Sequence, residues 1–152
     1  MIAGPWQMGT SEQGVFTHWA MSFVEERPLS YIGYGGDGRQ VRDLVHVDDL
    51  ADLVELQVSD PAGWAGVTVN VGGGLEGSLS LLEATAICAE LTGNELELGS
   101  VAETRPGDVP IYISDCSKLH SLCDWRPRRG PRETLTDTVA WLESNRQVLE
   151  TI

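Results

Sequence analysis

The sequence predicts an α/β fold for this chain of 152 residues, and three observations support that class. Apolar residues recur at helical spacing in several segments, and short β-branched runs lie between these segments. Turns rich in glycine, proline and aspartate separate the two kinds of segment, and no internal repeat or low-complexity segment appears. Several helices mixed with short strands in this way are typical of an α/β domain.

The first half of the chain contains two predicted helices with a strand pair between them. Apolar residues at helical spacing predict a helix over Ser11–Glu26. Two short apolar runs, Leu29–Tyr34 and Val41–Val47, then flank a glycine-dense turn and predict a hairpin-like unit. The second helix is expected over Val47–Val58, with Asp48 as its N-cap.

The second half begins with a strand. Val67–Val71 is β-branched with little polar alternation, which predicts a strand buried on both faces in a parallel sheet. Ser80 and Glu83 form a capping-box pattern that begins a helix through Leu91, and Gly93 ends it. The other expected elements are a strand at 96–98, a strand at 111–113, a small helix capped by Ser114 or Asp115 that ends near Cys123, and a last helix over Arg132–Leu149.

Composition restricts the classes of partner. The formal net charge is −13, from 10 basic and 23 acidic residues, so no broad positive face can form for a nucleic acid or an anionic membrane. Three cysteines without C-x-x-C spacing argue against a disulfide framework or a zinc site and favour reduced thiols. The sequence shows no basic leader pattern and no apolar run of membrane-spanning length, so we expect a cytoplasmic chain.

Two glycine loops match the dinucleotide-binding pattern G-x-G-x-x-G. The first, Gly33–Gly38, precedes residues that are typical of a strand, so no helix N-terminus is available for a pyrophosphate. The second, Gly72–Gly77, follows an expected strand and precedes a helix, and Glu97 lies about twenty residues beyond it. A flexible strand-to-helix loop is the preferred interpretation, because the capping box places the helix start near Ser80. A stand-alone nucleotide- or NAD-binding module built on Gly72–Gly77 remains the alternative.

Spacing alone indicates no catalytic residue and no metal site. His18, His46 and His120 show no H-x-x-x-H pair and no partner at metal-ligand spacing, so we expect structural histidines. Asp48-Asp49 is typical of a helix cap with a dipole partner, and the basic run at 126–132 is typical of a solvated loop.

Two turns pair an arginine with an acid. Arg42-Asp43 follows the first glycine loop, and Arg105-Pro106-Gly107-Asp108 lies in a turn stiffened by proline. Two guanidinium groups that face one cleft could clamp a diphosphate, whereas two separate surface salt bridges would contribute little to stability. The spacing leaves both interpretations open.

Several motifs in order resemble the later half of extended short-chain dehydrogenases/reductases, the NAD-dependent epimerases and dehydratases that act on nucleotide sugars. These motifs are Gly36–Leu50 (G-D-G-R-Q-V-R-D-L-V-H-V-D-D-L), Val69–Gly73, Arg105–Asp108, Asp115–Lys118 and Trp125–Pro127. The segments Ile2–Gly9 and Gln13–Phe16 most resemble the CDP-paratose (CDP-tyvelose) 2-epimerase branch of that family. The resemblance implies the C-terminal part of a Rossmann-like fold, with the last strands of the sheet and the substrate-binding lobe.

The resemblance also implies roles for particular residues. Arg42 and Arg105 match the arginines that hold the diphosphate of the nucleotide sugar, and Asp108 matches the acid that contacts the ribose. Four positions match residues that border the nucleotide: Gln13, Gly14, Tyr34 and Gly36. Ile2 and Pro5 match the strand end that touches the nicotinamide side of NAD.

Two departures from the family pattern shape the functional expectation. The cofactor fingerprint and the catalytic Tyr-x-x-x-Lys precede the matching segment, and here Tyr31, Tyr34 and Tyr112 are followed four residues later by glycine or cysteine. The only lysine is Lys118, so no catalytic dyad can form. We therefore expect residues 1–152 to be one partial domain without the N-terminal NAD-binding half. Such a chain is expected to bind a nucleotide-diphosphate sugar, to bind no NAD and to be inactive alone, and to form a homo-oligomer.

Overall fold

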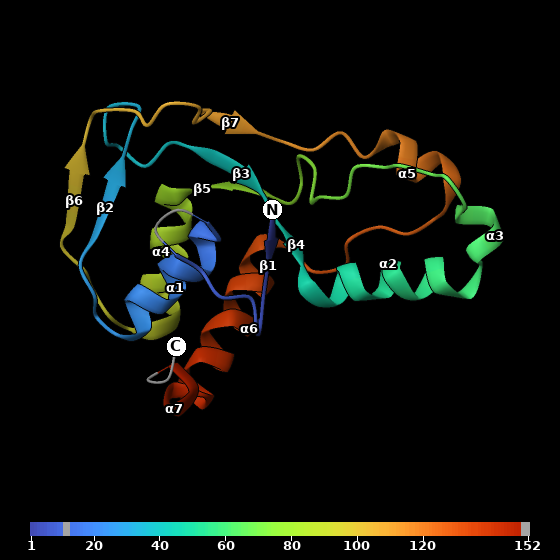
Figure 1. Cartoon of the computed structure of the whole chain (residues 1–152). Coiled ribbons are helices and arrows are strands. Elements are labelled where there is room, and N and C mark those ends of the chain that lie inside the picture. Colours follow the sequence, from blue (N-terminus) through green and yellow to red (C-terminus); the bar gives the residue numbers. More distant parts are fainter. Residues whose placement is uncertain (11–12, 150–152) are drawn as a thin grey trace.

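Helices and short strands alternate along the computed structural model, which describes residues 1–10 and 13–149 (Figure 1). The helices are α1 (Val15–Val24), α2 (Val47–Ser59), α3 (Pro61–Trp64), α4 (Leu81–Thr92), α5 (Ser117–Leu122), α6 (Pro131–Ser144) and α7 (Arg146–Leu149). The strands are β1 (Ile2–Ala3), β2 (Leu29–Ile32), β3 (Val41–Asp43), β4 (Val45–His46), β5 (Ser78–Ser80), β6 (Leu98–Val101) and β7 (Ile111–Tyr112). This arrangement confirms the predicted α/β class.

The described strands form three small sheets. β2 pairs with β6 in parallel, with Leu29 opposite Leu98, and β1 pairs with β4 in parallel, with Ile2 opposite Val45. β3 lies between the antiparallel β5 and the parallel β7. In Figure 1, β2 and β6 stand side by side at one edge of the molecule, apart from β3 and β5.

The hairpin predicted over Leu29–Val47 is wrong, because its two strands belong to different sheets. Backbone groups at the end of β2 find partners elsewhere in the chain. Gly33 N donates to Val101 O at 2.8 Å, and the Gln40 side chain donates to Ile32 O at 2.5 Å. Since these bonds satisfy the end of β2, the chain crosses to a second sheet without leaving these backbone groups unpaired.

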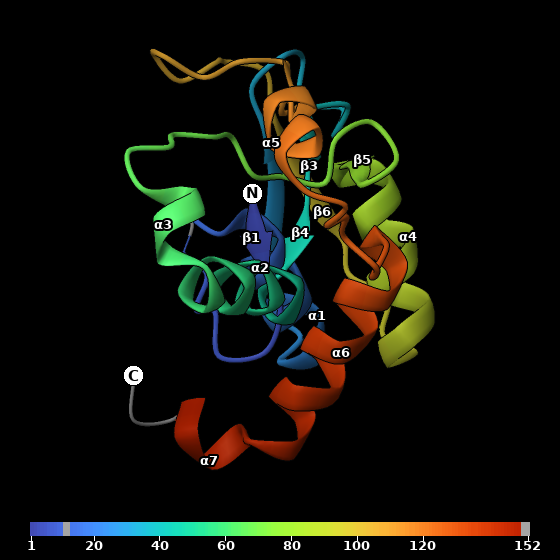
Figure 2. The same ribbon diagram turned by 90° about the vertical axis from the view of Figure 1, so that its right-hand side faces the viewer.

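α1 is the central helix of the larger core. It is apolar on most sides, and Phe16, Trp19, Ala20 and Phe23 are all buried. It packs against both α4 and α6, as Figures 1 and 2 show from two directions. Burial of each large apolar side chain stabilises the fold by about 1.5 to 3 kcal/mol, so this packing fixes the position of the N-terminal end of α1.

A smaller core supports the side of the molecule that carries α2, α3 and α5. Val45, Leu53, Leu119 and Trp125 form it, from β4, α2, α5 and the segment before α6. The Trp125 indole Nε1 donates to Asp49 O at 3.1 Å. The indole therefore ties the segment before α6 to the first turn of α2.

Helix ends with a clear cap signal follow the sequence prediction. The capping box of Ser80 and Glu83 is formed in both directions at the start of α4, and Gly93 ends the helix in the left-handed conformation. α1 begins at Val15, after a left-handed Gly14. Ser11, where that helix was predicted to begin, lies outside the described residues.

The strand predicted at Val67–Val71 is absent from the described structure. The segment runs beside α5, where Lys118 Nζ donates to Thr68 O at 2.7 Å and Asn70 Nδ2 donates to Asp115 O at 3.3 Å. Its residues are exposed or half-buried. No described strand lies alongside this segment, so its β-branched residues have no ladder to join.

Three further boundaries differ from the prediction. The N-cap of α5 is Cys116, not Ser114 or Asp115, although Asp115 Oδ1 still accepts from Ser117 N at 2.9 Å. The strand expected at 96–98 is β6, which begins at Leu98. The last helix is broken at Asn145, where the side-chain amide donates back to Trp141 O at 2.8 Å and so competes with helix continuation.

Candidate functional site

A cavity of about 750 Å³ lies between the start of α1, strands β2 and β3, and the loop that joins β6 to β7. Its lining includes five of the residues that the sequence singled out: Gln13, Gly14, Arg42, Arg105 and Asp108. Cavities that bind small ligands have volumes of roughly 300 to 1,000 Å³. The fold therefore brings three distant segments of the chain to one ligand-sized cavity.

Arg42 is fixed on β3 at the wall of this cavity. Its side chain is 16% exposed, and Nη1 donates to Val41 O at 2.8 Å and to Pro110 O at 3.4 Å. Nη2 forms an ion pair with Asp108 Oδ1 at 2.6 Å. The two arginine–acid turns thus meet through Arg42 and Asp108, and the interpretation of two separate surface salt bridges is wrong.

The loop that carries Arg105 and Asp108 is exposed and is stabilised by local turns. Asp108 N donates to Arg105 O at 3.2 Å, and Gly107 between them has φ +82°. Asp108 Oδ1 also accepts from Val109 N at 2.9 Å. These bonds curl the loop so that Arg105 and Asp108 both line the cavity.

The N-terminal end of α1 forms the opposite part of the lining. Gln13, Gly14 and Val15 line the cavity, and the helix has no side-chain cap at Gly14. A Cβ on Gly14 would lie 2.6 Å from Gln7 Nε2 and 3.0 Å from Gly9 Cα, so these residues pack too closely there for a side chain. The positive end of a helix dipole at this position favours an anionic or polar ligand.

Gln40 and His18 are among the lining residues that were not proposed as site residues from the sequence. Gln40 lines the cavity together with Arg42 and lies immediately before β3. His18 lies one helical turn after Gly14, on the same face of α1. Burial and the nearby charge of Arg27 lower the pKa of His18, so its imidazole is neutral at pH 7. The signal available in the sequence was spacing: Gln40 lies two residues before Arg42, and His18 lies four residues after Gly14.

The other four predicted site residues do not line the cavity. Tyr34 contacts the Arg105–Asp108 loop from outside, with its hydroxyl donating to Asp108 O at 2.7 Å. Gly36 packs against β6, where the Ser100 hydroxyl donates to its carbonyl at 2.9 Å. Ile2 is an exposed residue of the edge strand β1, and half-buried Pro5 follows that strand.

The Gly72–Gly77 loop does not have the structure of a dinucleotide-binding turn. β5 separates it from α4, and no described strand leads directly into it. The amide of Gly74 already donates to Asp43 Oδ2 at 3.1 Å, and a Cβ on Gly73 would lie 1.9 Å from Leu44 O. Since the loop is packed against Asp43 of β3 and against Leu44, it cannot cradle a pyrophosphate as a helix-opening turn does.

The Gly33–Gly38 loop also lacks the structure of a dinucleotide-binding turn, because β3 and not a helix follows it, as predicted. The described residues therefore contain no strand–glycine loop–helix unit that fits NAD. Lys118, the only lysine of the chain, lies on α5 and does not line the cavity. No catalytic Tyr–Lys dyad forms within the described residues.

Asp43 is a buried structural carboxylate next to the cavity. Its Oδ2 accepts from Gly74 N and from Ser114 N, both at 3.1 Å. Burial alone would raise the pKa of Asp43, but the N-terminal ammonium and the hydrogen bonds from Ser114 and Gly74 hold it below its usual value. Asp43 therefore joins β3 to two loops and is not available to pair with Arg42.

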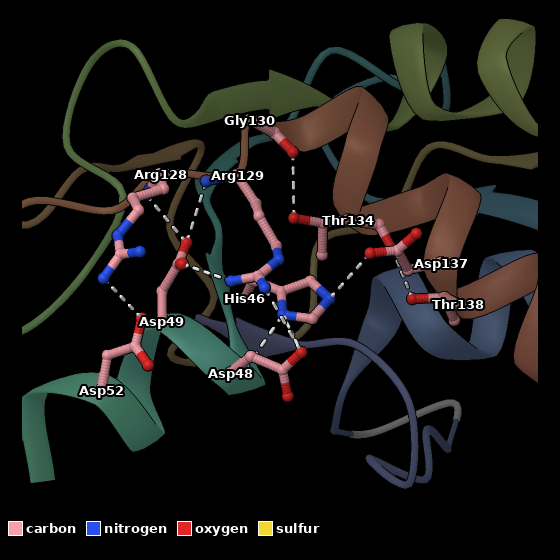
Figure 3. A network of polar contacts seen from close by, with 10 residues as sticks. All are labelled: His46, Asp48, Asp49, Asp52, Arg128, Arg129, Gly130, Thr134, Asp137 and Thr138. Atoms are coloured by element: carbon pink, nitrogen blue, oxygen red, sulfur yellow. Dashed lines mark hydrogen bonds and ion pairs between the residues drawn. The ribbon is translucent and has the colours of Figure 1, made fainter. Parts of the chain in front are cut away.

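A polar network at the start of α2 corrects two sequence predictions, the N-cap of that helix and the solvated loop at 126–132 (Figure 3). The N-cap of α2 is His46, whose Nδ1 accepts from Asp48 N at 3.0 Å, and not Asp48. Asp49 is buried and accepts from the backbone amides of Arg128 and Arg129, each at 3.0 Å, and from Arg129 Nη1 at 2.7 Å. A sequence pattern cannot show that an exposed-looking acid will be buried by a loop eighty residues away.

The basic run at 126–132 is thus a structural connection in part, and not only a solvated loop. Figure 3 shows Arg128 reaching Asp52 while Arg129 lies across Asp49. His46 is fully buried and its Nε2 lies 3.5 Å from Asp137 of α6. This network joins the start of α2 to the segment before α6, and it pairs Arg128 with Asp52 and Arg129 with Asp49.

Two of the three cysteines, Cys88 and Cys116, are not activated thiols. Burial raises the pKa of Cys88 to about 12 and also raises the pKa of Cys116, so neither thiol ionises at neutral pH. No group of three or more His, Cys, Asp or Glu side chains is placed to hold a metal ion among the residues described. No described helix is both long enough and apolar enough to cross a membrane.

Comparison with known proteins identifies relatives along nearly the whole chain. Residues 1–72 match the model of the NAD dependent epimerase/dehydratase family. CDP-paratose 2-epimerase from Salmonella typhi is 25% identical over 143 residues, which cover 91% of this chain and 41% of the relative. UDP-glucose 4-epimerase from Yersinia pestis is 32% identical over 150 residues, which cover 92% of this chain and 43% of the relative.

Solved structures give the same result for the fold. The structure of UDP-glucose 4-epimerase from Thermus thermophilus with NAD is 27% identical, with a TM-score of 0.77, over 95% of this chain and 44% of that chain. MoeE5 in complex with UDP-glucose and NAD is 26% identical, with a TM-score of 0.77, over 97% of this chain and 46% of that chain. This chain spans less than half the length of the relatives that it matches.

The fold is therefore a C-terminal portion of the Rossmann-like fold of extended short-chain dehydrogenases/reductases. Within that class, the chain belongs to the NAD dependent epimerase/dehydratase family. The predicted family and fold class are both confirmed. The relatives named above act on CDP- and UDP-linked sugars by their names, so they do not select one nucleotide.

Proposed function

We propose that this chain is the nucleotide-sugar-binding part of an NAD-dependent nucleotide-sugar epimerase or dehydratase. The observation that carries the proposal is the cavity in which Arg42 and Arg105 line the same space, next to Asp108 and the N-terminal end of α1. Guanidinium groups bind phosphate oxygens through charge-assisted, often bidentate hydrogen bonds. The relatives, which act on nucleotide sugars by their names, support the same class of ligand.

In this proposal different residues bind different parts of the nucleotide sugar. Arg42 and Arg105 hold the diphosphate, and Asp108 accepts from the ribose hydroxyls after it exchanges its ion pair with Arg42. Gln13 and Gly14 border the nucleotide where the helix dipole of α1 points into the cavity. Gly36 contacts β6 and does not line the cavity. Residues 1–152 make up one partial domain.

Isothermal titration calorimetry with CDP and UDP, and with a sugar conjugate of each, tests the proposal. Arg42→Ala and Arg105→Ala are each expected to weaken binding roughly ten- to 150-fold, the equivalent of one lost charge-assisted contact of about 1.5 to 3 kcal/mol. Arg39→Ala is the matched control, because the Arg39 side chain is 80% exposed and pairs with Asp37 outside the cavity. Absence of heat with every ligand for the wild-type chain would refute the proposal.

We further propose that the chain alone binds no NAD and catalyses no epimerisation. The support is the lack of a fitting glycine turn and of a Tyr–Lys dyad within the described residues. Ile2 and Pro5 would then touch the nicotinamide side of NAD only in a longer protein. Incubation with NAD and a CDP- or UDP-sugar is expected to leave the sugar unchanged by proton NMR. Detected epimer would contradict this proposal while leaving nucleotide binding intact.

Self-association through β7 is a second proposal, with a second copy of this chain as the partner. β7 is at the edge of its sheet among the described strands, and Ile111, Tyr112 and Ile113 are 61%, 54% and 37% exposed. Exposed apolar edge strands pair readily with another chain. Light scattering at micromolar concentration is expected to show a dimer or larger species that Ile111→Lys disrupts. A monomeric wild-type chain would contradict it.

A further inference from the structure

Tyr34 has a backbone conformation that a tyrosine rarely adopts. Its φ is +51°, and the glycines on both sides of it, Gly33 and Gly35, have φ +88°. A glycine at position 34 would adopt this conformation without strain, so the backbone alone does not explain a tyrosine here. Strain of this kind points to a role for the side chain that holds the residue in place.

Two hydrogen bonds join Tyr34 to the loop between β6 and β7. Its amide donates to Thr104 Oγ1 at 2.9 Å, and its hydroxyl donates to Asp108 O at 2.7 Å. These two contacts bracket the Arg105–Gly107 segment, one before it and one after it. Tyr34 therefore spans the loop from the outside and does not line the cavity.

The loop has little buried surface to hold it in position. Residues 103–107 are exposed, so the loop buries little apolar surface of its own. Such segments open locally at low free-energy cost unless polar contacts fix them. On the cavity side, the Asp108 carboxylate contacts Arg42, and on the outer side the Asp108 carbonyl contacts Tyr34. Asp108 is thus held between the two.

We propose that Tyr34 is a positioning residue that holds the Arg105–Asp108 loop over the cavity, so that Arg105 and Arg42 face a single diphosphate. The inference rests on the proposed function for the identity of the ligand. Its mechanical part, a tether on the loop, depends only on the described contacts. Tyr34 acts through Arg105 and Asp108 and does not itself contact the ligand.

Tyr34→Phe removes the hydroxyl and keeps the ring, the backbone conformation and the packing. We expect it to weaken binding of CDP or UDP about five- to tenfold, because Arg105 must then be ordered by the ligand. Tyr31→Phe is the matched control: it also removes a hydroxyl bond of 2.7 Å, but to Thr85 of α4, away from the loop. The control is expected to leave nucleotide affinity unchanged.

A double-mutant cycle separates positioning from a general structural role. In an Arg105→Ala background, Tyr34→Phe is expected to have a clearly smaller effect on affinity than in the wild type, because the tether then positions only Asp108 and no longer a group that binds phosphate. Equal weakening of binding in both backgrounds, or no weakening in the wild-type background, would overturn the inference.

Hydrogen exchange tests the tether even if no nucleotide binds. Tyr34→Phe is expected to speed exchange of the Asp108 and Val109 amides, which lie beside the lost bond, while the amides of α4 keep their rates. Unchanged exchange at Asp108 would overturn the inference. A wild-type chain that binds no nucleoside diphosphate would refute the proposed function alone, and the exchange rates would still report on the tether.

Discussion

The two glycine loops match the same dinucleotide-binding pattern, yet they need glycine for different physical reasons. In Gly33–Gly38 the backbone is left-handed at every glycine, and the loop contains Tyr34, which contacts the loop between β6 and β7. In Gly72–Gly77 only Gly74 is left-handed, and the other glycines are required because Asp43 and Ser114, Leu44, or the loop itself lies against them. The pattern therefore reports tight backbone geometry in both loops and a phosphate site in neither.

The largest expected effect is in the second loop. A Cβ on Gly73 would lie 1.9 Å from Leu44 O, and this backbone is held in place because Leu44 N donates to Gly77 O at 2.8 Å. Gly73→Ala is expected to lower the free energy of unfolding by about 3 kcal/mol. Gly74→Ala is the control, since its Cβ would meet nothing within 4 Å, and only its left-handed φ of +63° costs about 1 kcal/mol. Urea denaturation that ranks the two variants equally would contradict close approach as the cause.

A smaller effect is expected where the second loop is anchored to β3. Asp43→Asn removes the charge that accepts from Gly74 N and Ser114 N, and we expect a loss of roughly 2 to 3 kcal/mol at pH 7. Against the effect of burial, the N-terminal ammonium and the hydrogen bonds from Ser114 and Gly74 hold the pKa of Asp43 below its ordinary value, so its stabilisation is fully present at pH values well above that ordinary value. It is lost as the pH falls through the lower, folded-state pKa.

Unfolding of the wild type and of Asp43→Asn at several pH values checks this sign. The difference between the two is expected to stay constant from pH 7 to about 5 and to shrink below about pH 4. A difference that grows on acidification would show that the carboxylate is not stabilised in its charged form.

The smallest effects are expected in the first loop. A Cβ on Gly36 would lie 2.2 Å from Ser100 Oγ, which can rotate away, but 2.9 Å from Val101 N, which cannot. Gly36→Ala is expected to cost about 2 kcal/mol. Gly35→Ala is expected to cost about 1 kcal/mol, because open space surrounds its Cβ position and only its φ of +88° opposes a side chain. Thermal unfolding of both variants compares them, and equal losses would contradict a role for contact with β6.

Local signals predicted the helices better than the strands. The capping box of Ser80 and Glu83 and the terminal Gly93 place α4 because these interactions lie within a few residues of one another. The hairpin over Leu29–Val47 and the strand at Val67–Val71 were wrong because pairing depends on which distant strand satisfies the backbone, and that is not encoded in a short run. The cap of α2 was missed because His46 lies outside the usual cap residues.

By itself, the sequence determined the α/β class, both ends of α4, the family resemblance and the residue types suited to a diphosphate. Only the tertiary structure decided which acid pairs with Arg42. The neighbouring Asp43 is buried by hydrogen bonds from two loops, whereas Asp108, sixty-six positions away, reaches the guanidinium at 2.6 Å. Local propensity acts over a few residues, but an ion pair between distant segments forms only where packing of the whole chain places both charges at one cavity.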